Sequence, residues 1–378
     1  MFKTKRLIGL LLVLALVFAA CGGDDDSTDT TEADGGETTT TAAAASDLKI
    51  CEVTDTGGVD DKSFNASAWA GAQRAAEDFG AEAKVLESQA ETDYEVNINS
   101  FIDQECDLIV TVGFLLGDAT QTAANQNPDQ EFAIVDFAYG NVTDENFEEV
   151  LDEDGNPIPQ IENANVKGLL FNTDEAAFLA GYLAAGVSET GVVGTFGGIN
   201  IPPVTIFMEG FRNGVLHYNS IKGTDVEVLG WDGAEGLFTG NFESLDDGRA
   251  FAQSLVDEGA DIVLPVAGPV GLGSAALASE LGSFYVIGVD VDAYEADTNN
   301  QSVYLTSVLK RIDNAVYAAA EETFAGNFSD ELYFGTLANE GVGLAPFHDL
   351  AGEVPDELAA EVEQLRADII SGAISVSG

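Results

Sequence analysis

The residues best suited to bind a ligand stand close together between Asp55 and Asn65. Two adjacent glycines in this stretch let the backbone turn and approach a bound group closely, and Asp, Ser and Asn side chains offer hydrogen bonds beside the ring of Phe64. A phenyl ring held among polar groups can stack on a flat ligand. The same stretch could instead begin a helix, with Asp61 or Ser63 as its cap and Phe64 packed against the core. The two interpretations are compatible, and the sequence leaves both open.

Patterns typical of catalysis, of a dinucleotide cofactor or of a metal site are weak. His217 and His348 have no Ser or Cys nucleophile motif beside them, and no His and Cys cluster has the spacing of a zinc site. The run 271–276 reads Gly-x-Gly-x-x-Ala, but it comes late in the chain and follows a lengthened turn, so it is better explained as a strand-to-helix loop than as a nicotinamide site. The sequence therefore predicts a binding protein that is not an enzyme, with no cofactor and no metal.

Polar residues and glycines recur at the carboxyl ends of the predicted strands. They are the loop from Asp55, then Gly113 and Phe114, Asp136, Gly197 and Gly198, Ala267 and Gly268, and Gly288 to Asp290. In open parallel sheets this edge is where ligands bind, so the recurrence favours a binding site there.

An alternation of short apolar runs and longer amphipathic runs positions these residues. Strands are predicted over 48–53, 82–86, 108–112, 132–135 and 166–171, with helices over 66–79, 95–105 and 118–127. A second series has strands over 192–196, 226–231, 262–266 and 285–289, with helices over 174–187, 205–218, 246–258 and 274–281. This order predicts an α/β fold of two doubly wound, Rossmann-like lobes, each with a parallel sheet, with the ligand between them.

The C-terminal part of the chain is predicted to return across the gap between the lobes. The strand 303–308 and the helix 311–325 are assigned to the first lobe, and the segment 331–343 and the helix 354–371 complete the chain. The expected N-terminal lobe is thus 47–172 with about 292–327, and the C-terminal lobe is 173–291 with about 328–378. Several crossings would make a stiffer hinge than one linker.

The first 46 residues predict export and a lipid anchor. Lys3, Lys5 and Arg6 precede an apolar run from Leu7 to Ala20, and then comes Cys21, so 1–20 has the form of a lipoprotein signal peptide and Cys21 is the expected lipidation site. Residues 22–46 are polar or small and should act as a tether. The expected location is the extracytoplasmic face of the cell membrane. The alternative is an ordinary secretory signal with a chance cysteine.

The balance of charge is strongly acidic. The chain has 14 Lys and Arg against 66 Asp and Glu, a formal net charge of −52. Nucleic acid would be repelled by this charge, and so would an anionic membrane surface, so neither is an expected partner. The shortage of cations makes each remaining one informative: Lys62 lies in the stretch from Asp55 to Asn65, and Lys310 lies near the end of the chain.

Two cysteines remain beyond Cys21. Cys51 lies in the first predicted strand, and Cys106 lies just before the strand 108–112. In an oxidising compartment two unpaired thiols would be unusual. The two residues form either a disulfide, if those strands are neighbours, or two buried free thiols.

Several motifs, in order, resemble the basic membrane protein family. They are Val53 to Asn65, Val112-Gly113-Phe114, Asp136 to Gly140, Gly181-Tyr182, Phe207 to Phe211, Gly288-Val289-Asp290 and Ser307 to Lys310. The resemblance covers about residues 47–345. It implies a type I periplasmic binding protein fold and a lipoprotein that serves an ABC importer. Several members of this family bind purine nucleosides.

The resemblance implies a role for nine residues. Phe64 and Phe207 would sandwich the base, and Ser63, Asn65 and Asp136 would hydrogen-bond the base or the cleft wall. Gly268 would offer backbone contacts, Asp290 and Lys310 would hold the ribose hydroxyls, and Asp55 would shape the first loop. The implied partners are a nucleoside and the permease and ATPase subunits, with the receptor itself a monomer. The insertion 141–165 and Pro202-Pro203 depart from the family pattern, and the prolines make the position of Phe207 uncertain.

Two other functions stay open at this point. The chain could be a receptor of the same fold for a sugar or another small polar solute. It could also be a ligand-sensing lipoprotein with no role in transport.

Overall fold

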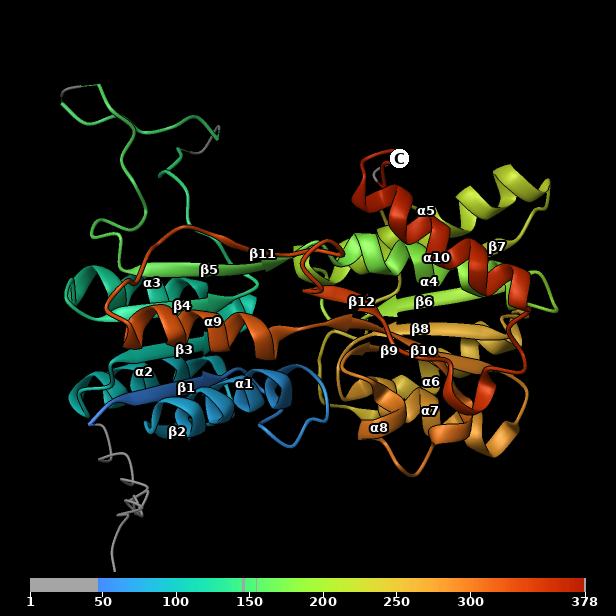
Figure 1. The fold of residues 1–378 in the computed structure, drawn as a ribbon, viewed down its shortest axis with the longest axis horizontal. Coiled ribbons are helices and arrows are strands. Elements are labelled where there is room, and N and C mark those ends of the chain that lie inside the picture. Colours follow the sequence, from blue (N-terminus) through green and yellow to red (C-terminus); the bar gives the residue numbers. More distant parts are fainter. Residues whose placement is uncertain (1–46, 145–146, 154, 377–378) are drawn as a thin grey trace, which may run out of the picture. The chain divides into compact units, whose positions relative to one another are not determined.

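The computed structural model describes residues 47–376, apart from 145, 146 and 154. The predicted signal peptide, the lipidation site Cys21 and the tether lie outside the described residues. The described chain forms two six-stranded sheets, which define two lobes (Figure 1). The first sheet has the order β11-β5-β4-β3-β1-β2 and the second has the order β12-β10-β9-β8-β6-β7. All the pairings within them are parallel except that of β10 with β12.

The first lobe is built from the N-terminal strands with helices on both faces. Its elements are β1 (Lys49–Thr54), α1 (Phe64–Phe79), β2 (Glu82–Leu86), α2 (Tyr94–Asp103), β3 (Leu108–Val112), α3 (Gly117–Gln126), β4 (Glu131–Val135) and β5 (Val166–Phe171), with α9 (Ile312–Phe324) and β11 (Tyr333–Gly335) added from the end of the chain. Helices α1 and α9 pack together on one face, and α2 and α3 pack on the other. The parallel strands are buried on both faces, which explains their nearly continuous apolar sequences.

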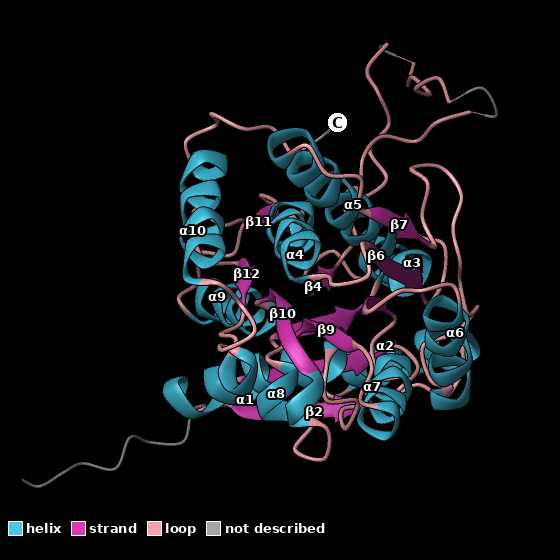
Figure 2. Ribbon diagram, turned by 90° about the vertical axis from the view of Figure 1, so that its right-hand side faces the viewer, coloured by secondary structure: helices cyan, strands magenta, loops and turns pink. Residues whose placement is uncertain are grey.

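The second lobe repeats this plan. Its elements are α4 (Thr173–Val187), β6 (Val192–Gly197), α5 (Pro202–Lys222), β7 (Glu227–Leu229), α6 (Leu245–Asp257), β8 (Ile262–Val266), α7 (Val270–Leu281), β9 (Tyr285–Asp290), α8 (Ala293–Ala296), β10 (Tyr304–Lys310), β12 (Val342–Leu344) and α10 (Asp356–Ile370). Figure 2 shows α4 between α10 and α5, and both helices contact it. Helices α6 and α7 cover the opposite face of this sheet. The expected α/β fold with two doubly wound lobes is confirmed.

The chain passes between the lobes three times within the described residues, after β5, after β10 and between β11 and β12. Hydrogen bonds tie the crossings to one another: the Asn172 N–H donates to the Gly335 carbonyl at 2.8 Å, and the Arg311 N–H donates to the Gly341 carbonyl at 2.9 Å. Crossings tied side by side give the lobes a hinge with a defined path.

Two assignments to a lobe are wrong. The segment 331–343 was placed in the second lobe with the rest of 328–378, but it contains β11, which pairs with β5 in the first sheet. The strand predicted over 303–308 was placed in the first lobe, but β10 pairs with β9 and β12 in the second sheet. The following helix, α9, does return to the first lobe, where it packs on α1. A strand buried on both faces can occupy the centre of either sheet, so its composition did not distinguish them.

Cys51 and Cys106 form a disulfide, with their Cα atoms 6.1 Å apart. The disulfide required the strands of the two cysteines to be neighbours, and β1 and β3 do pair in parallel. None of the helices in the described part of the chain is both long and apolar enough to cross a bilayer.

Candidate functional site

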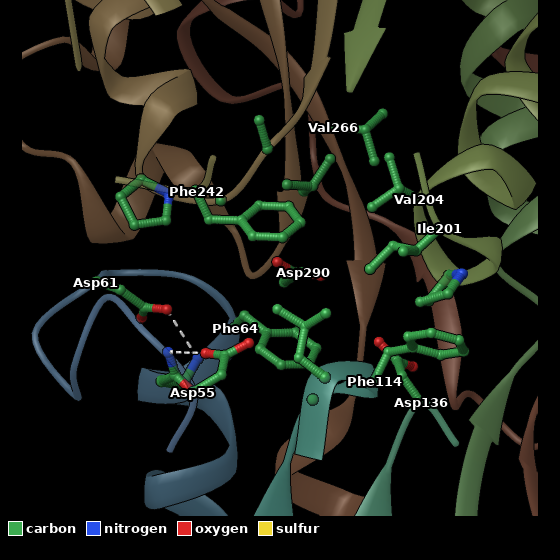
Figure 3. A pocket seen from close by; sticks show the side chains of 18 of the residues that line it. Asp55, Asp61, Phe64, Phe114, Asp136, Ile201, Val204, Phe242, Val266 and Asp290 are labelled. Carbon is green, nitrogen blue, oxygen red and sulfur yellow. Dashed lines mark hydrogen bonds between the residues drawn. The ribbon is translucent and has the colours of Figure 1, made fainter. Parts of the chain in front are cut away.

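A cavity lies where the strands of both sheets end, and residues of both lobes line it (Figure 3). It encloses about 630 Å³ of empty space, including solvent at its mouth. Eight of the nine predicted site residues line it: Asp55, Phe64, Asn65, Asp136, Phe207, Gly268, Asp290 and Lys310. The ninth, Ser63, lies directly behind this lining and touches Asp290.

The loop from Asp55 to Asn65 both begins a helix and contributes to the site. Asp61 is the cap of α1: its carboxylate accepts the backbone N–H groups of Ser63, Asn65 and Ala66 at 2.8 to 2.9 Å. Because Asp61 takes these N–H groups, the Ser63 hydroxyl is free to donate to Asp290 in the second lobe at 2.6 Å. Capping of α1 and contact with the site are therefore divided between the two residues.

Asp55 is a buried carboxyl group at the end of β1. The amide of Asn65 donates to it at 3.0 Å, and a Cβ atom on Gly113 would come within 2.6 Å of its carboxylate, so the glycine is needed there. Gly113 also has a φ of 119°, which favours glycine. Burial raises the pKa of Asp55 to about 8, partly offset by the Asn65 hydrogen bond. At neutral pH this carboxyl group is therefore mainly protonated and can donate a hydrogen bond to a ligand.

Lys310 is a buried cation at the centre of the site. It is the last residue of β10 in the second sheet, and its ammonium group is paired with Asp136, which follows β4 in the first sheet. Three rings surround Nζ, with centroids 4.9 Å away for Phe64, 5.2 Å for Phe171 and 5.8 Å for Phe207. Burial raises the pKa of Asp136, and the charge of Lys310 opposes this rise. One side chain thus contacts both lobes and both of the predicted stacking rings.

Asp290 ends β9 with its backbone in the left-handed region, at φ 67°. The backbone of Asp136, the residue after β4, is also in the left-handed region, at φ 65°. Strained conformations of this kind in non-glycine residues are concentrated at functional sites. Burial raises the pKa of Asp290 to about 6, while Lys310 and the Ser63 hydroxyl both lower it. Asp290 is therefore mainly ionised at neutral pH and accepts hydrogen bonds.

The two prolines do not displace Phe207 from the site. Pro202 and Pro203 begin α5, where the missing N–H and the fixed φ of proline suit the first helical turn. Phe207 lies just beyond that turn and is 2% exposed. Its ring lines the cavity from the second lobe, and Phe64 lines it from the first.

Gly268 precedes α7 with a φ of 52°, and it lines the cavity. The glycines of the Gly-x-Gly run do not form the loop that was expected, because they lie inside α7. A Cβ atom on Gly273 would come within 1.9 Å of the Leu245 carbonyl at the start of α6. These glycines therefore allow close packing of helices.

Sequence reasoning missed most of the apolar lining. Asp61 was considered only as a cap, and Phe114 only as a strand end, but both line the cavity. Ala267 and Val289 were likewise noted only at strand ends, and the residues that were not singled out for the site are Thr56, Leu115, Ile201, Pro203, Val204, Phe242, Val266 and Pro269. The signal for Phe242 was an aromatic residue in a loop that is otherwise mostly polar residues and glycine, with Phe238 as the other phenylalanine. Lys62 does not line the cavity, and its ammonium group lies 3.5 Å from Asp297.

The described residues bring together no three His, Cys, Asp or Glu side chains able to hold a metal ion.

One buried acid lies behind the site. Glu52 in the middle of β1 is fully buried, and neither of its carboxylate oxygens has a hydrogen-bond partner within the described structure. Burial raises the pKa of Glu52 well above its ordinary value, and the charge of Asp61 adds to this rise.

Glu52 should make stability fall as the pH rises. The folded state keeps the proton that the unfolded state releases, so each pH unit between the unfolded and folded pKa values costs up to about 1.4 kcal/mol. In urea unfolding at high salt, Glu52→Gln should remove this dependence. The stability difference between variant and wild type should then grow from pH 5.5 to pH 8. Parallel curves for the two proteins would contradict the assignment.

A family model described as ABC transporter substrate-binding protein, PnrA-like (Bmp), matches residues 49–378. Basic membrane protein A of Borreliella burgdorferi is 33% identical over 324 residues, 85% of each chain. The ABC transporter nucleoside-binding protein BmpA of Lactococcus lactis is 30% identical over 349 residues, 88% of this chain and 89% of the relative. The Listeria innocua protein named CD4+ T-cell-stimulating antigen is 31% identical over 349 residues, 87% and 88% of the two chains.

Solved structures share this fold. An ABC transporter solute-binding protein from Aeropyrum pernix K1 superposes with a TM-score of 0.71 at 28% identity, covering 87% of this chain and 92% of that one. A transcriptional activator of the comK gene from Bacillus halodurans superposes with a TM-score of 0.65 at 19% identity, covering 86% and 99%, and is similar in fold alone.

Proposed function

Because the chain belongs to the Bmp family of PnrA-like ABC transporter substrate-binding proteins, we propose that it captures a purine nucleoside in the cavity between its lobes and delivers it to a membrane permease. The family is one of solute receptors rather than enzymes. The observation that carries the proposal is the cavity itself, which combines Phe64 and Phe207 from opposite lobes with Asp136, Asp290 and Lys310.

The lining suits a flat, uncharged ligand with hydroxyl groups. Aromatic rings supply stacking area for a base. The ionised carboxylate of Asp290 can accept hydrogen bonds from vicinal hydroxyls, and the protonated carboxyl group of Asp55 can donate one. The polar groups of the site can thus serve both the base and the sugar of a nucleoside.

A phosphate group would be disfavoured in this cavity. Lys310 is the one basic residue among the described residues that line it, and it is already paired with Asp136. Asp61 and Asp290 add negative charge nearby. These charges favour a neutral nucleoside over a nucleotide.

Binding should stabilise the closed arrangement of the lobes. Ser63 with Asp290, and Lys310 with Asp136, already join them across the cavity. A ligand that touches both lobes favours the closed state by its differential affinity, and this state is the one that a permease would select. In this proposal the protein acts as a monomer, tethered by a lipid on Cys21, with permease and ATPase subunits as its partners.

Calorimetric titration with inosine, guanosine, adenosine, uridine and ribose tests the ligand class. We expect heat of binding with the purine nucleosides. A response to ribose alone would favour a sugar receptor of the same fold, and no heat with any nucleoside would remove the proposal.

Phe64→Ala should weaken purine nucleoside binding by about 1 to 3 kcal/mol, the size of one base-stacking contact. The matched control is Phe334→Ala: Phe334 lies on β11, is 47% exposed and does not line the cavity. The affinity of the Phe334→Ala variant for the nucleoside should equal that of the wild type. Equal affinities for Phe64→Ala and the wild type would show that Phe64 does not stack on the base.

A further inference from the structure

A second pocket lies next to the nucleoside cavity, and a few shared side chains separate the two. It encloses about 800 Å³ of empty space, including open solvent. The first lobe contributes Thr56, Glu91, Tyr94 and Leu115 to its lining, and the second lobe contributes Ile199 and residues 240–244. We call it the outer pocket, and we call the nucleoside cavity the inner cavity. Thr56, Leu115 and Phe242 line both, so these three side chains form the wall between them.

Phe242 is the largest side chain in this wall. Figure 3 shows it across the inner cavity from Phe64. Its ring lies against Gly198, where a Cβ atom would come within 2.2 Å of the ring, so only glycine leaves room for it.

The loop that carries Phe242 is held in place by its polar neighbours. The side-chain oxygen of Asn241 accepts the N–H groups of Glu243 and Ser244 at 3.0 and 2.8 Å, and its amide donates to Asp247 in α6 at 2.9 Å. The Gly240 N–H donates to the Gly198 carbonyl at 2.8 Å. The ring is therefore presented by a structured turn, as a specificity-determining side chain must be.

The outer pocket has a different chemistry from the inner cavity. Glu91 and Glu243 are exposed carboxylates on opposite lobes. Tyr94, which lines the same pocket, is 3% exposed, and its hydroxyl group has no partner in the described structure. Burial raises the pKa of the Tyr94 phenol, and the charges of Glu91, Asp93 and Glu243 add to the rise. This negative field favours a cationic group.

We propose that Phe242 is a specificity-determining partition, which restricts the inner cavity to unsubstituted nucleosides by closing it off from the acidic outer pocket. The inference rests on the proposed nucleoside function. Shortening this side chain should join the two spaces and admit a nucleoside that carries an alkyl chain, with a preference for a chain that ends in an ammonium group near Glu91 and Glu243.

The test compares wild type, Phe242→Leu and Phe242→Ala by calorimetry. The ligands are adenosine, N6-butyladenosine, N6-(4-aminobutyl)adenosine and the same two chains attached at the 5′ oxygen, since either end of the ligand could face the wall. Wild type should bind adenosine at least about tenfold more tightly than any chain-bearing ligand. Phe242→Ala should reverse or abolish this ratio at one attachment point, more strongly for the aminobutyl chain, with Phe242→Leu intermediate.

Thermal unfolding of each variant, with Phe334→Ala as control, establishes that the folded protein is being titrated. An unchanged ratio in both Phe242 variants would overturn the inference while leaving the nucleoside function intact. So would a wild type that binds chain-bearing ligands as tightly as adenosine. If wild type binds none of these nucleosides, the proposed function fails, and this inference fails with it.

Discussion

Lys310→Met should destabilise the folded protein by about 3 to 5 kcal/mol, because it leaves Asp136 buried without its partner charge. The methionine keeps the apolar stem against the rings of Phe64, Phe171 and Phe207, so the loss reports the charge rather than the packing. Urea unfolding at neutral pH measures it. The loss should shrink as the pH falls, since protonation of Asp136 removes the unpaired charge.

The double variant Lys310→Met with Asp136→Asn is the matched control. Replacing both members of a buried pair by neutral groups is often close to neutral in stability, so most of the lost free energy should return. Nucleoside binding should remain weakened in both variants. A single variant as stable as the wild type, or a double variant no better than the single one, would contradict the view that this pair is a coupled, buried unit.

Loss of the disulfide should cost about 4 kcal/mol. Cys51 and Cys106 are 55 residues apart, and cross-linking a loop of this length removes much of the conformational entropy of the unfolded chain. The measurement is urea unfolding of the wild type and of the Cys51→Ala, Cys106→Ala double variant. A protein that begins after Cys21, or that carries Cys21→Ser, keeps the thiol count simple.

Reductant provides the control for this second prediction. It should lower the stability of the wild type towards that of the double variant and leave the double variant unchanged. Two free thiols in the denatured, unreduced wild type would contradict the disulfide.

The sequence predicted the strands and helices of both lobes closely, because parallel strands buried on both faces are nearly uninterrupted apolar runs. The predicted strands 82–86, 108–112 and 166–171 coincide with β2, β3 and β5. The predicted start of α7 was late by four residues, because Gly271 and Gly273 were interpreted as a loop although they allow helix packing. A glycine's role depends on its neighbours in space, which composition does not show.

The polar half of the site was predictable and much of the apolar half was not. Asp55 and Asp136 follow strands and Asp290 ends one, and the ends of parallel strands meet at one edge of a sheet. Ile201, Val204 and Phe242 reach the cavity from a helix start and an irregular loop. Their positions depend on tertiary contacts such as the one between Phe242 and Gly198. That the pair of Lys310 and Asp136 joins the two lobes likewise could not be predicted, since β10 was assigned to the first lobe.

The three crossings between the lobes also determine when each lobe can be completed as the ribosome delivers the chain. Helix α9 and strand β11 belong to the first lobe but follow almost all of the second in sequence. Until they emerge, the edge of β5 is unpaired and the apolar side of α1 is uncovered, features that invite aggregation. The N-terminal half therefore cannot reach its native state on its own. A chain that stops before Ile312 should remain incompletely folded, however long it is given.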